Sequence, residues 1–265
     1  MISSPPILRR ILSPPALVVA IALASLASGT SAAAPAAYVA LGDSYSSGVG
    51  AKRYVSRSGP CRRSPQSWVH RLGRKLTTFR ACSAATIGDV LALQLEPFPD
   101  NTRLVTITVG ANDANFGAVL SACLFDGPAD CDSRVDRAER YVRHELPARL
   151  RRVFDAIRRR APQATVIVAG YPRLVARRPW CGDDGTLDDG EQRRLNEGSD
   201  VLARTTAAEV GRHRGFRFAD VRTAFDGHEV CSSAPWIHGA GSSISAFHPN
   251  GHGYAAYGRV ARSAL

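Results

Sequence analysis

The chain has 265 residues, of which 45% are hydrophobic, a proportion typical of globular proteins rather than of disordered or fibrous chains. Its formal net charge is +11. The basic residues are mostly scattered arginines without a nucleic-acid-binding motif, so we expect no nucleic-acid partner and only transient contact with lipid or other anionic surfaces.

Residues 1–34 have the features of a secretory signal peptide. Arg9 and Arg10 precede an apolar stretch at 11–27, and the small residues at 31–34 offer a cleavage site. Cleavage would leave residues 35–265, a length that suits one domain, with 32 basic and 23 acidic residues and a net charge of +9. We therefore predict an extracellular protein.

Six cysteines follow this segment. An even number of cysteines in a secreted chain favours disulfide bonds, here three. Six cysteines allow fifteen pairings, and the sequence does not choose among them. Pairing of neighbours closes local loops, and we expect Cys61–Cys82, Cys123–Cys131 and Cys181–Cys231. No C-x-x-C pair is present, so we predict neither a zinc site nor another metal site.

Strand-like and helix-like segments alternate along residues 38–264. The pattern predicts strands at 38–42, 79–82, 103–109, 164–169 and 216–221. It predicts helices at 64–76, 86–95, 133–160, 191–211 and 248–264, the third of them kinked or split at Pro147. Residues 43–64 are predicted to be an exposed loop. This alternation indicates a single α/β domain with a doubly wound, mostly parallel sheet of about five strands flanked by helices.

Polar residues follow the first three predicted strands. Ser44 ends a G-D-S sequence after the first strand, Ala84 follows the second, and Asn112 lies in a G-A-N-D sequence after the third. His248, followed by proline, lies near the end of the chain. Because the carboxyl ends of parallel strands share one edge, these residues can converge there. A serine, a histidine and hydrogen-bond donors are what acyl transfer requires.

These motifs, in this order, resemble the SGNH hydrolases, also called the GDSL esterase/lipase family, over essentially all of residues 35–265. The six cysteines and the Ala81-Cys82-Ser83 stretch are most similar to the secreted, three-disulfide bacterial lipases and esterases of that family. The resemblance implies a flavodoxin-like sheet. It also implies hydrolysis of small-molecule or lipid esters through an acyl-enzyme, without a cofactor, and we expect a monomer.

The resemblance also assigns roles. Ser44 would be the nucleophile, and His248 the general base and then the general acid. The oxyanion hole would comprise the backbone N–H groups of Ser44 and Ala84 and the side chain of Asn112. Asp43 and Asp113 are interpreted as residues that organise turns beside the site.

Two positions depart from the family pattern. Ala84 stands where glycine is usual, and we expect its turn to have an ordinary backbone conformation because alanine disfavours positive φ. Ser245 stands where the family commonly has aspartate, three residues before the histidine. We therefore expect a Ser–His dyad in which a backbone carbonyl, that of Ser245, orients His248.

Several alternatives stay open at this stage. His228 and His238 are alternative bases. Aromatic residues either fill the core or line an acyl pocket: Trp68, Phe116, Phe125 and Trp236. The chain could also be a carbohydrate O-acetyl esterase on the same scaffold, or a secreted binding protein that has lost activity. If His248 is the base, we expect activity to rise with pH around about 6.5, the ordinary pKa of histidine.

Overall fold

The structure is a computed structural model that describes residues 1–3, 35–178 and 187–265. The chain divides into two units, Met1–Ala34 and Pro35–Leu265. The predicted signal peptide lies mostly outside the described residues and stays a prediction. Within the described residues, no helix combines the length and the apolar character needed to cross a bilayer.

Residues 35–265 form an α/β fold around one five-stranded sheet in which every pair of neighbouring strands is parallel. The spatial order is β2-β1-β3-β4-β5, the flavodoxin-like order of a doubly wound sheet. The strands are β1 (Ala37–Ala40), β2 (Thr78–Phe79), β3 (Thr102–Ile107), β4 (Thr165–Ala169) and β5 (Phe216–Ala219). The predicted fold class is therefore confirmed.

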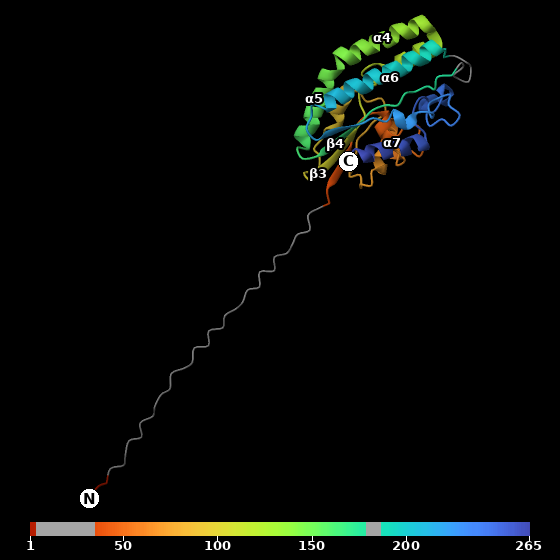
Figure 1. Cartoon of the computed structure of the whole chain (residues 1–265). Helices are drawn as coiled ribbons and strands as arrows, with labels where there is room; N and C mark the ends of the chain where they lie inside the picture. Colours follow the sequence, from red (N-terminus) through yellow and green to blue (C-terminus); the bar gives the residue numbers. More distant parts are fainter. Residues whose placement is uncertain (4–34, 179–186) are drawn as a thin grey trace. The chain divides into compact units, whose positions relative to one another are not determined.

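Helices cover both faces of this sheet, as its almost completely buried central strands require. Helix α7 (Gly251–Ser263) packs against the turn η2 (Trp68–Arg71). Helix α5 (Leu146–Arg160) packs against α6 (Asp189–Val210). Figure 1 places α7 on the opposite side of β3 and β4 from α5 and α6.

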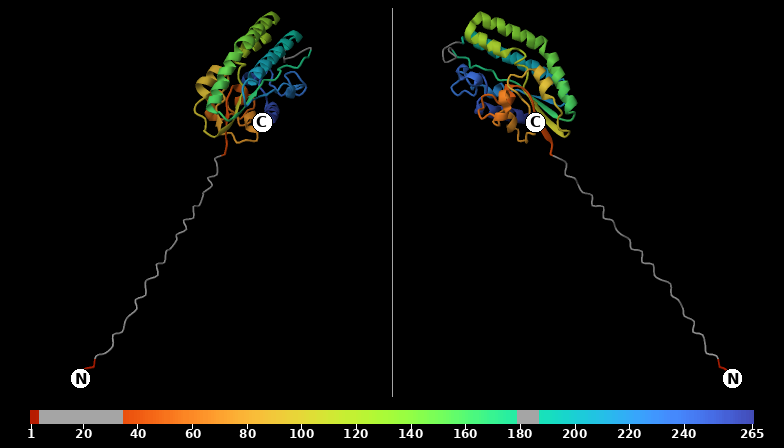
Figure 2. Two further views of the ribbon diagram at one scale, coloured as in Figure 1. Left: turned by 60° about the vertical axis from the view of Figure 1, so that its left-hand side comes forward. Right: turned by 180° about the vertical axis from the view of Figure 1, so that it is seen from behind.

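A helical layer extends beyond the sheet. Helices α4 (Pro128–His144) and α6 pack along each other, and they lie side by side in Figure 1 and in both views of Figure 2. The predicted split of the long helix is confirmed, because α4 ends at His144 and α5 begins at Leu146. Pro147 thus lies in the first turn of α5, where its missing N–H removes no hydrogen bond.

Two local predictions were wrong. Residues 64–76 form only the 3₁₀ turn η2 rather than a helix. The reason is visible at Ser64 and Ser67, whose hydroxyls donate to the carbonyls of Lys52 (2.7 Å) and Ser46 (2.6 Å) and so favour a non-helical path. Residues 43–51 are not an exposed loop, because they contain the short helix α1 (Ser44–Ser47) and are buried throughout.

Candidate active site

Ser44 follows β1 at the carboxyl edge of the sheet. The turn depends on Gly42, whose φ is +116° and where a Cβ atom would lie 2.4 Å from the Thr108 carbonyl oxygen. Only glycine allows this backbone conformation and this close approach. Asp43 caps α1 by accepting a hydrogen bond from the Tyr45 N–H, and Ser44, 8% exposed, lines a cavity.

Asp43 lines the same cavity, but it is only 1% exposed and its carboxylate is held by the fold. Its carboxylate accepts hydrogen bonds from the Thr108 hydroxyl (2.6 Å) and from the Tyr171 hydroxyl. Burial raises the pKa of Asp43 to about 6, although the hydrogen bonds from Thr108 and Tyr171 lower it. The arrangement fits a residue that organises the turn carrying Ser44.

His248 contacts Ser44 directly. The distance from His248 Nε2 to Ser44 Oγ is 2.8 Å, and Nδ1 lies 2.8 Å from the Ala246 carbonyl oxygen. Because a carbonyl can only accept, Nδ1 carries the proton and Nε2 accepts from the serine hydroxyl. A dyad oriented by a backbone carbonyl was expected, but the predicted carbonyl was wrong by one residue. The Ser245 carbonyl instead accepts the backbone N–H of His248 (3.0 Å).

The backbone at Phe247 explains this difference. Its φ is +57°, and this left-handed residue turns the chain so that the carbonyl two residues before His248 reaches its ring. The Tyr45 hydroxyl donates to the Phe247 carbonyl (2.6 Å), and the Tyr45 ring lies 5.2 Å from the His248 ring. Apart from its position next to Ser44, no feature of the sequence indicates this role of Tyr45.

His248 has an unusual protonation equilibrium. Burial lowers its pKa from 6.5 to about 4, while the hydrogen bond to Ala246 opposes this and the charges of His238 and Arg62 add to it. The partner of Nδ1 is a neutral carbonyl, which stabilises an imidazolium less than a carboxylate would. The expectation of a midpoint near 6.5 is therefore replaced by one well below it.

The two remaining oxyanion-hole candidates line the same cavity as Ser44 and His248. Ala84 has a φ of +64°, so the expectation of an ordinary backbone was wrong. The side-chain amide of Asn112 donates to the Ala85 carbonyl (2.9 Å), which ties the two turns together and leaves its second N–H for another acceptor. Asp113 accepts from the Ile87 N–H (3.0 Å) and so fixes the start of α2 (Ile87–Asp89).

The cavity beside Ser44 has a volume of about 330 Å³ and extends between α3 (Phe116–Ser121), α4 and α6. Its wall is mainly apolar, and includes Val119, Leu120, Val135, Val142, Leu195 and Leu202. Among the four aromatic candidates, Phe116 lines this cavity. Trp68 is buried in the core and Phe125 is exposed, while Trp236 packs against Phe225 and His228.

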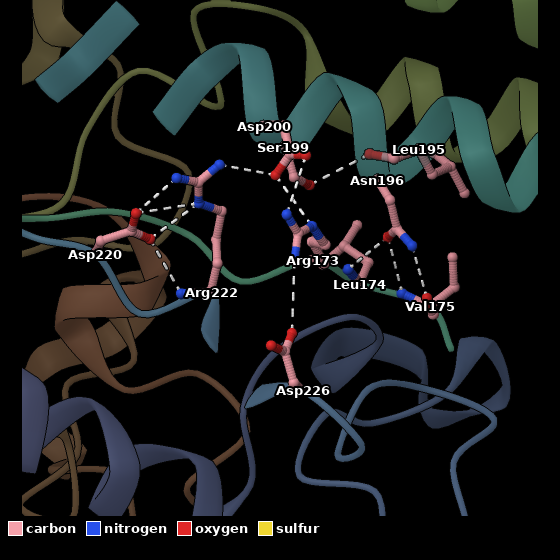
Figure 3. Close-up of polar contacts among 10 residues, drawn as sticks. All are labelled: Arg173, Leu174, Val175, Leu195, Asn196, Ser199, Asp200, Asp220, Arg222 and Asp226. Carbon is pink, nitrogen blue, oxygen red and sulfur yellow. Dashed lines mark hydrogen bonds and ion pairs between the residues drawn. The ribbon is translucent and has the colours of Figure 1, made fainter. Parts of the chain in front are cut away.

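One wall of the cavity is held by an ion-pair network (Figure 3). Arg222 binds Asp220 (2.6 Å) and Asp200 (2.8 Å), and Arg173 binds Asp200 (3.1 Å). Asp200 belongs to α6, so the network fastens the segment after β4 to that helix. Leu174, which lines the cavity, is positioned by this contact. The sequence did not reveal this network, because its members are distant along the chain.

The alternative bases do not contact Ser44. His228 Nδ1 lies 2.8 Å from the Ala234 carbonyl, and His238 Nε2 lies 3.0 Å from the Gly50 carbonyl. Among the described residues, no group of three or more His, Cys, Asp and Glu side chains is arranged to hold a metal ion.

Two disulfide bonds are present in the described chain, Cys61–Cys82 and Cys123–Cys131. The first joins the loop after α1 to the turn that carries Ala84. The third expected pair includes Cys181, which lies outside the described residues, so Cys181–Cys231 stays a prediction.

Comparison with known proteins agrees with this geometry. The model of the GDSL-like lipase/acylhydrolase family matches residues 40–256. The chain belongs to this family. It is therefore an ester hydrolase of the lipase/acylhydrolase type, and the recognition made from its motifs is confirmed.

Individual relatives within this family are similar over nearly the whole chain. A lipase from Streptomyces rimosus is 41% identical over 254 residues, which is 92% of this chain and 94% of that protein. The crystal structure of an extracellular lipase from Streptomyces rimosus has a TM-score of 0.81 at 42% identity, covering 87% of this chain and all of the other. A phospholipase A1 from Streptomyces albidoflavus NA297 has a TM-score of 0.82 at 38% identity, covering 88% of this chain and all of the other.

Proposed function

We propose that this family member is a secreted serine esterase or lipase that cleaves carboxylic acyl esters, including lipid esters, through a Ser44–His248 dyad. The observation that carries the proposal is the hydrogen-bonded chain from the Ala246 carbonyl through His248 to the Ser44 hydroxyl, with both contacts at 2.8 Å. This chain holds the imidazole in the tautomer that accepts the serine proton.

The reaction would follow the acyl-enzyme route. Ser44 Oγ attacks the ester carbonyl carbon while its proton passes to His248 Nε2, and a tetrahedral oxyanion forms. His248 then returns the proton to the alcohol oxygen as the carbon–oxygen bond breaks, which leaves an acyl-serine. Water, deprotonated by the same nitrogen, hydrolyses the acyl-serine and releases the acid.

The oxyanion would be stabilised by donors on three turns at the edge of the sheet. These donors are the backbone N–H groups of Ser44 and Ala84 and the second N–H of the Asn112 amide. They are attached to turns fixed by hydrogen bonds, notably Asn112 to Ala85, so they require little reorganisation when charge develops on the substrate oxygen.

The cavity supports an acyl chain as the group bound beside Ser44. The cavity has an apolar wall between α3, α4 and α6, and its volume of about 330 Å³ is larger than an acetyl group requires. This size and this apolar lining disfavour a carbohydrate O-acetyl esterase. The similarity to a lipase and to a phospholipase A1 also favours an acyl ester as the substrate. Secretion is supported by the disulfide bonds and by the extracellular lipase from Streptomyces rimosus. We also propose a monomer with at most transient contact with lipid surfaces.

Hydrolysis of p-nitrophenyl esters of increasing chain length tests this function. The oxidised protein should cleave both short-chain and long-chain esters, and Ser44→Ala should abolish turnover. Ser83→Ala is the matched control, because Ser83 lines the same cavity and has no role in the proposed chemistry. Turnover that survives in Ser44→Ala would contradict the proposed nucleophile. A folded wild type without activity on any ester would favour the binding-protein alternative.

A further inference from the structure

The apolar cavity beside Ser44 has an ion pair in its wall. Within the part of the chain that the structure describes, the acidic and basic residues that line the cavity are Asp43 and His248 next to the nucleophile, and Glu139 of α4 and Arg194 of α6. The side chains of Arg194 and Glu139 are only 22% and 17% exposed. Neither has a role in the proposed dyad chemistry, so we ask what they do to a bound acyl chain.

Arg194 lies at the end of the cavity away from Ser44. On α6 the lining extends from Leu202 to Arg194, and in the described chain no earlier residue of this helix lines the cavity. Leu202 lies at the Ser44 end, because a Cβ atom on Gly110, two residues before Asn112, would be 3.8 Å from the Leu202 side chain. At a helical rise of about 1.5 Å per residue, Arg194 lies about 12 Å from Leu202 along α6.

The wall formed by α4 ends at the same level. Its lining extends from Val142 back to Val135. Asp132 and Asp136 lie on either side of Val135 in the sequence, and both bind the guanidinium of Arg194, Asp132 at 3.1 Å. Helices α4 and α6 lie side by side in Figure 1. The Arg194 side chain therefore joins the two helices at the point where the lining of both of them stops.

The guanidinium of Arg194 is held by further carboxylates. Glu197 lies 2.9 Å from it and Glu139 lies 3.6 Å from it. We call Arg194 together with Asp132, Asp136, Glu139 and Glu197 the Arg194 cluster. Moving the guanidinium aside would break charge-assisted hydrogen bonds. A methylene group placed against this cluster would bury polar rather than apolar surface, which is unfavourable.

The length of this wall can be converted into an acyl chain length. Carbon–carbon bonds of about 1.5 Å in an extended zigzag chain advance it by about 1.3 Å per methylene group. A wall of about 12 Å therefore accommodates about nine methylene groups. The acyl carbonyl carbon lies at Ser44 during the reaction, so the end of a chain of this length would reach the Arg194 cluster.

We propose that the Arg194 cluster closes the distal end of the acyl cavity and that Arg194 limits the length of the acyl chain, so that esters of medium-chain acids of about ten carbons are preferred over esters of longer acids. The inference rests on the proposed Ser44–His248 function and adds a specificity-determining residue to it. Arg194 takes no part in bond making or breaking. Its side chain meets the end of the acyl chain and excludes longer ones.

Arg194→Leu is a suitable test variant because it removes the charge without leaving a buried carboxylate unpaired. Three of the carboxylates that it releases have side chains more than half exposed, namely those of Asp132, Asp136 and Glu197. The fourth, Glu139, keeps an ion pair with Arg143 at 3.2 Å. We therefore expect the variant to fold, and Arg194→Ala makes the same comparison if it does not.

Two control variants separate chain length from charge. Arg194→Lys keeps a cation at the end of the cavity and should keep the limit. Arg193→Leu removes a positive charge from the neighbouring position, where the side chain is exposed and pairs with Asp189. Arg193 does not line the cavity, so its replacement should not change the chain-length preference.

The assay compares fluorogenic 4-methylumbelliferyl esters of butyric, decanoic and tetradecanoic acid. They are used at nanomolar concentrations, below aggregation, so that binding to a lipid surface cannot contribute. For the wild type we expect kcat/KM to rise from butyrate to decanoate and to fall for tetradecanoate. Arg194→Leu should raise the ratio of kcat/KM for tetradecanoate to that for decanoate by about tenfold or more, because each methylene group buried in an apolar site can contribute about fourfold. Butyrate hydrolysis should not change, since this chain is too short to reach Arg194.

Several results would overturn the chain-length limit. A wild-type kcat/KM that continues to rise up to tetradecanoate would show that the cavity is not closed at Arg194. An unchanged ratio in a folded Arg194→Leu protein would show that another group limits the chain. The same gain in Arg193→Leu would show a general effect of the lost charge. An equal loss on all three esters would show that the Arg194 cluster supports the site without selecting chain length.

Failure of the proposed function is recognised separately. If the wild type cleaves none of the esters, calorimetric titration with decanoate and tetradecanoate still tests the cavity. Tighter binding of decanoate by the wild type, with the order reversed in Arg194→Leu, would support the limit at Arg194. The same order of affinities in both proteins, or no binding of either acid, would refute it.

Discussion

Acidification gives a quantitative test of the His248 environment. The neutral imidazole is the active base, so activity is present above the pKa of His248 and is lost as the pH falls through it. Burial places that pKa at about 4 rather than 6.5, and the opposing hydrogen bond to the neutral Ala246 carbonyl is too weak to restore it. At pH 5 about 90% of His248 would be neutral, whereas a histidine with an ordinary pKa would be only about 3% neutral. The two cases differ about thirtyfold in the expected activity.

The pH dependence of kcat/KM is the appropriate assay, because it reports the free enzyme. Hydrolysis of p-nitrophenyl butyrate would be followed from pH 3.5 to 9 at a wavelength where nitrophenol and nitrophenolate absorb equally. We expect a nearly constant kcat/KM from about pH 5.5 upward, and a fall with a midpoint near pH 4. Circular dichroism at each pH separates loss of the base from acid unfolding.

The Arg62→Gln variant gives a second test of the pKa of His248. Removing a positive charge that lowers the pKa of His248 should move the midpoint to higher pH. A wild-type midpoint near 6.5, in a protein that stays folded, would refute the argument that burial without a carboxylate partner sets the pKa of His248.

Other variants test the remaining parts of the site. Asn112→Ala should lower kcat by about 10²-fold to 10³-fold in a protein that stays folded, with a slightly lower melting temperature because the hydrogen bond to Ala85 is lost. An unchanged kcat would remove Asn112 from the oxyanion hole. Gly198→Leu should lower kcat/KM for long-chain esters but not for butyrate esters. Gly198 lines the cavity, and a Cβ atom there would meet only the Val135 side chain at 4.0 Å, so a leucine side chain fits and fills space that a long acyl chain needs. Gly198→Ala is the control, and an equal loss on both chain lengths would contradict the position of the acyl chain. Ala84→Gly should raise the free energy of unfolding by about 1 kcal/mol in chemical denaturation, because φ at this position is +64°, and a destabilised variant would contradict this.

The fold followed from features that are local in the sequence. The β-branched runs at 103–109 and 164–169 and the intervening helices predicted the parallel sheet, and the motif order indicated Ser44, Asn112 and His248. Pro147 correctly predicted the division between α4 and α5. These features could be recognised because hydrophobic periodicity and proline geometry act within a few residues.

The errors arose where distant residues determine the backbone. The apolar spacing around Trp68 predicted a helix, but the hydroxyls of Ser64 and Ser67 bind carbonyls more than ten residues away. The positive φ of Phe247 and the Tyr45 hydroxyl bound to its carbonyl select the Ala246 carbonyl as the partner of His248. Neither effect is encoded in a short motif.

The network at Arg173, Asp200 and Arg222 illustrates the same limit. These side chains come from the segment after β4, from α6 and from the segment after β5, and they meet only in the folded protein. Charge counting along the sequence treats them as scattered surface residues, whereas in the structure they fasten one wall of the acyl cavity.

Covalent trapping of the nucleophile tests the central claim most directly. The oxidised wild type would be treated with a fluorophosphonate, digested, and analysed by mass spectrometry for the modified residue. We predict stoichiometric labelling of Ser44, and strongly reduced labelling in His248→Ala, because the serine proton then has no acceptor at 2.8 Å. Labelling at another residue, or a folded wild type that is not labelled at all, would contradict the Ser44–His248 dyad.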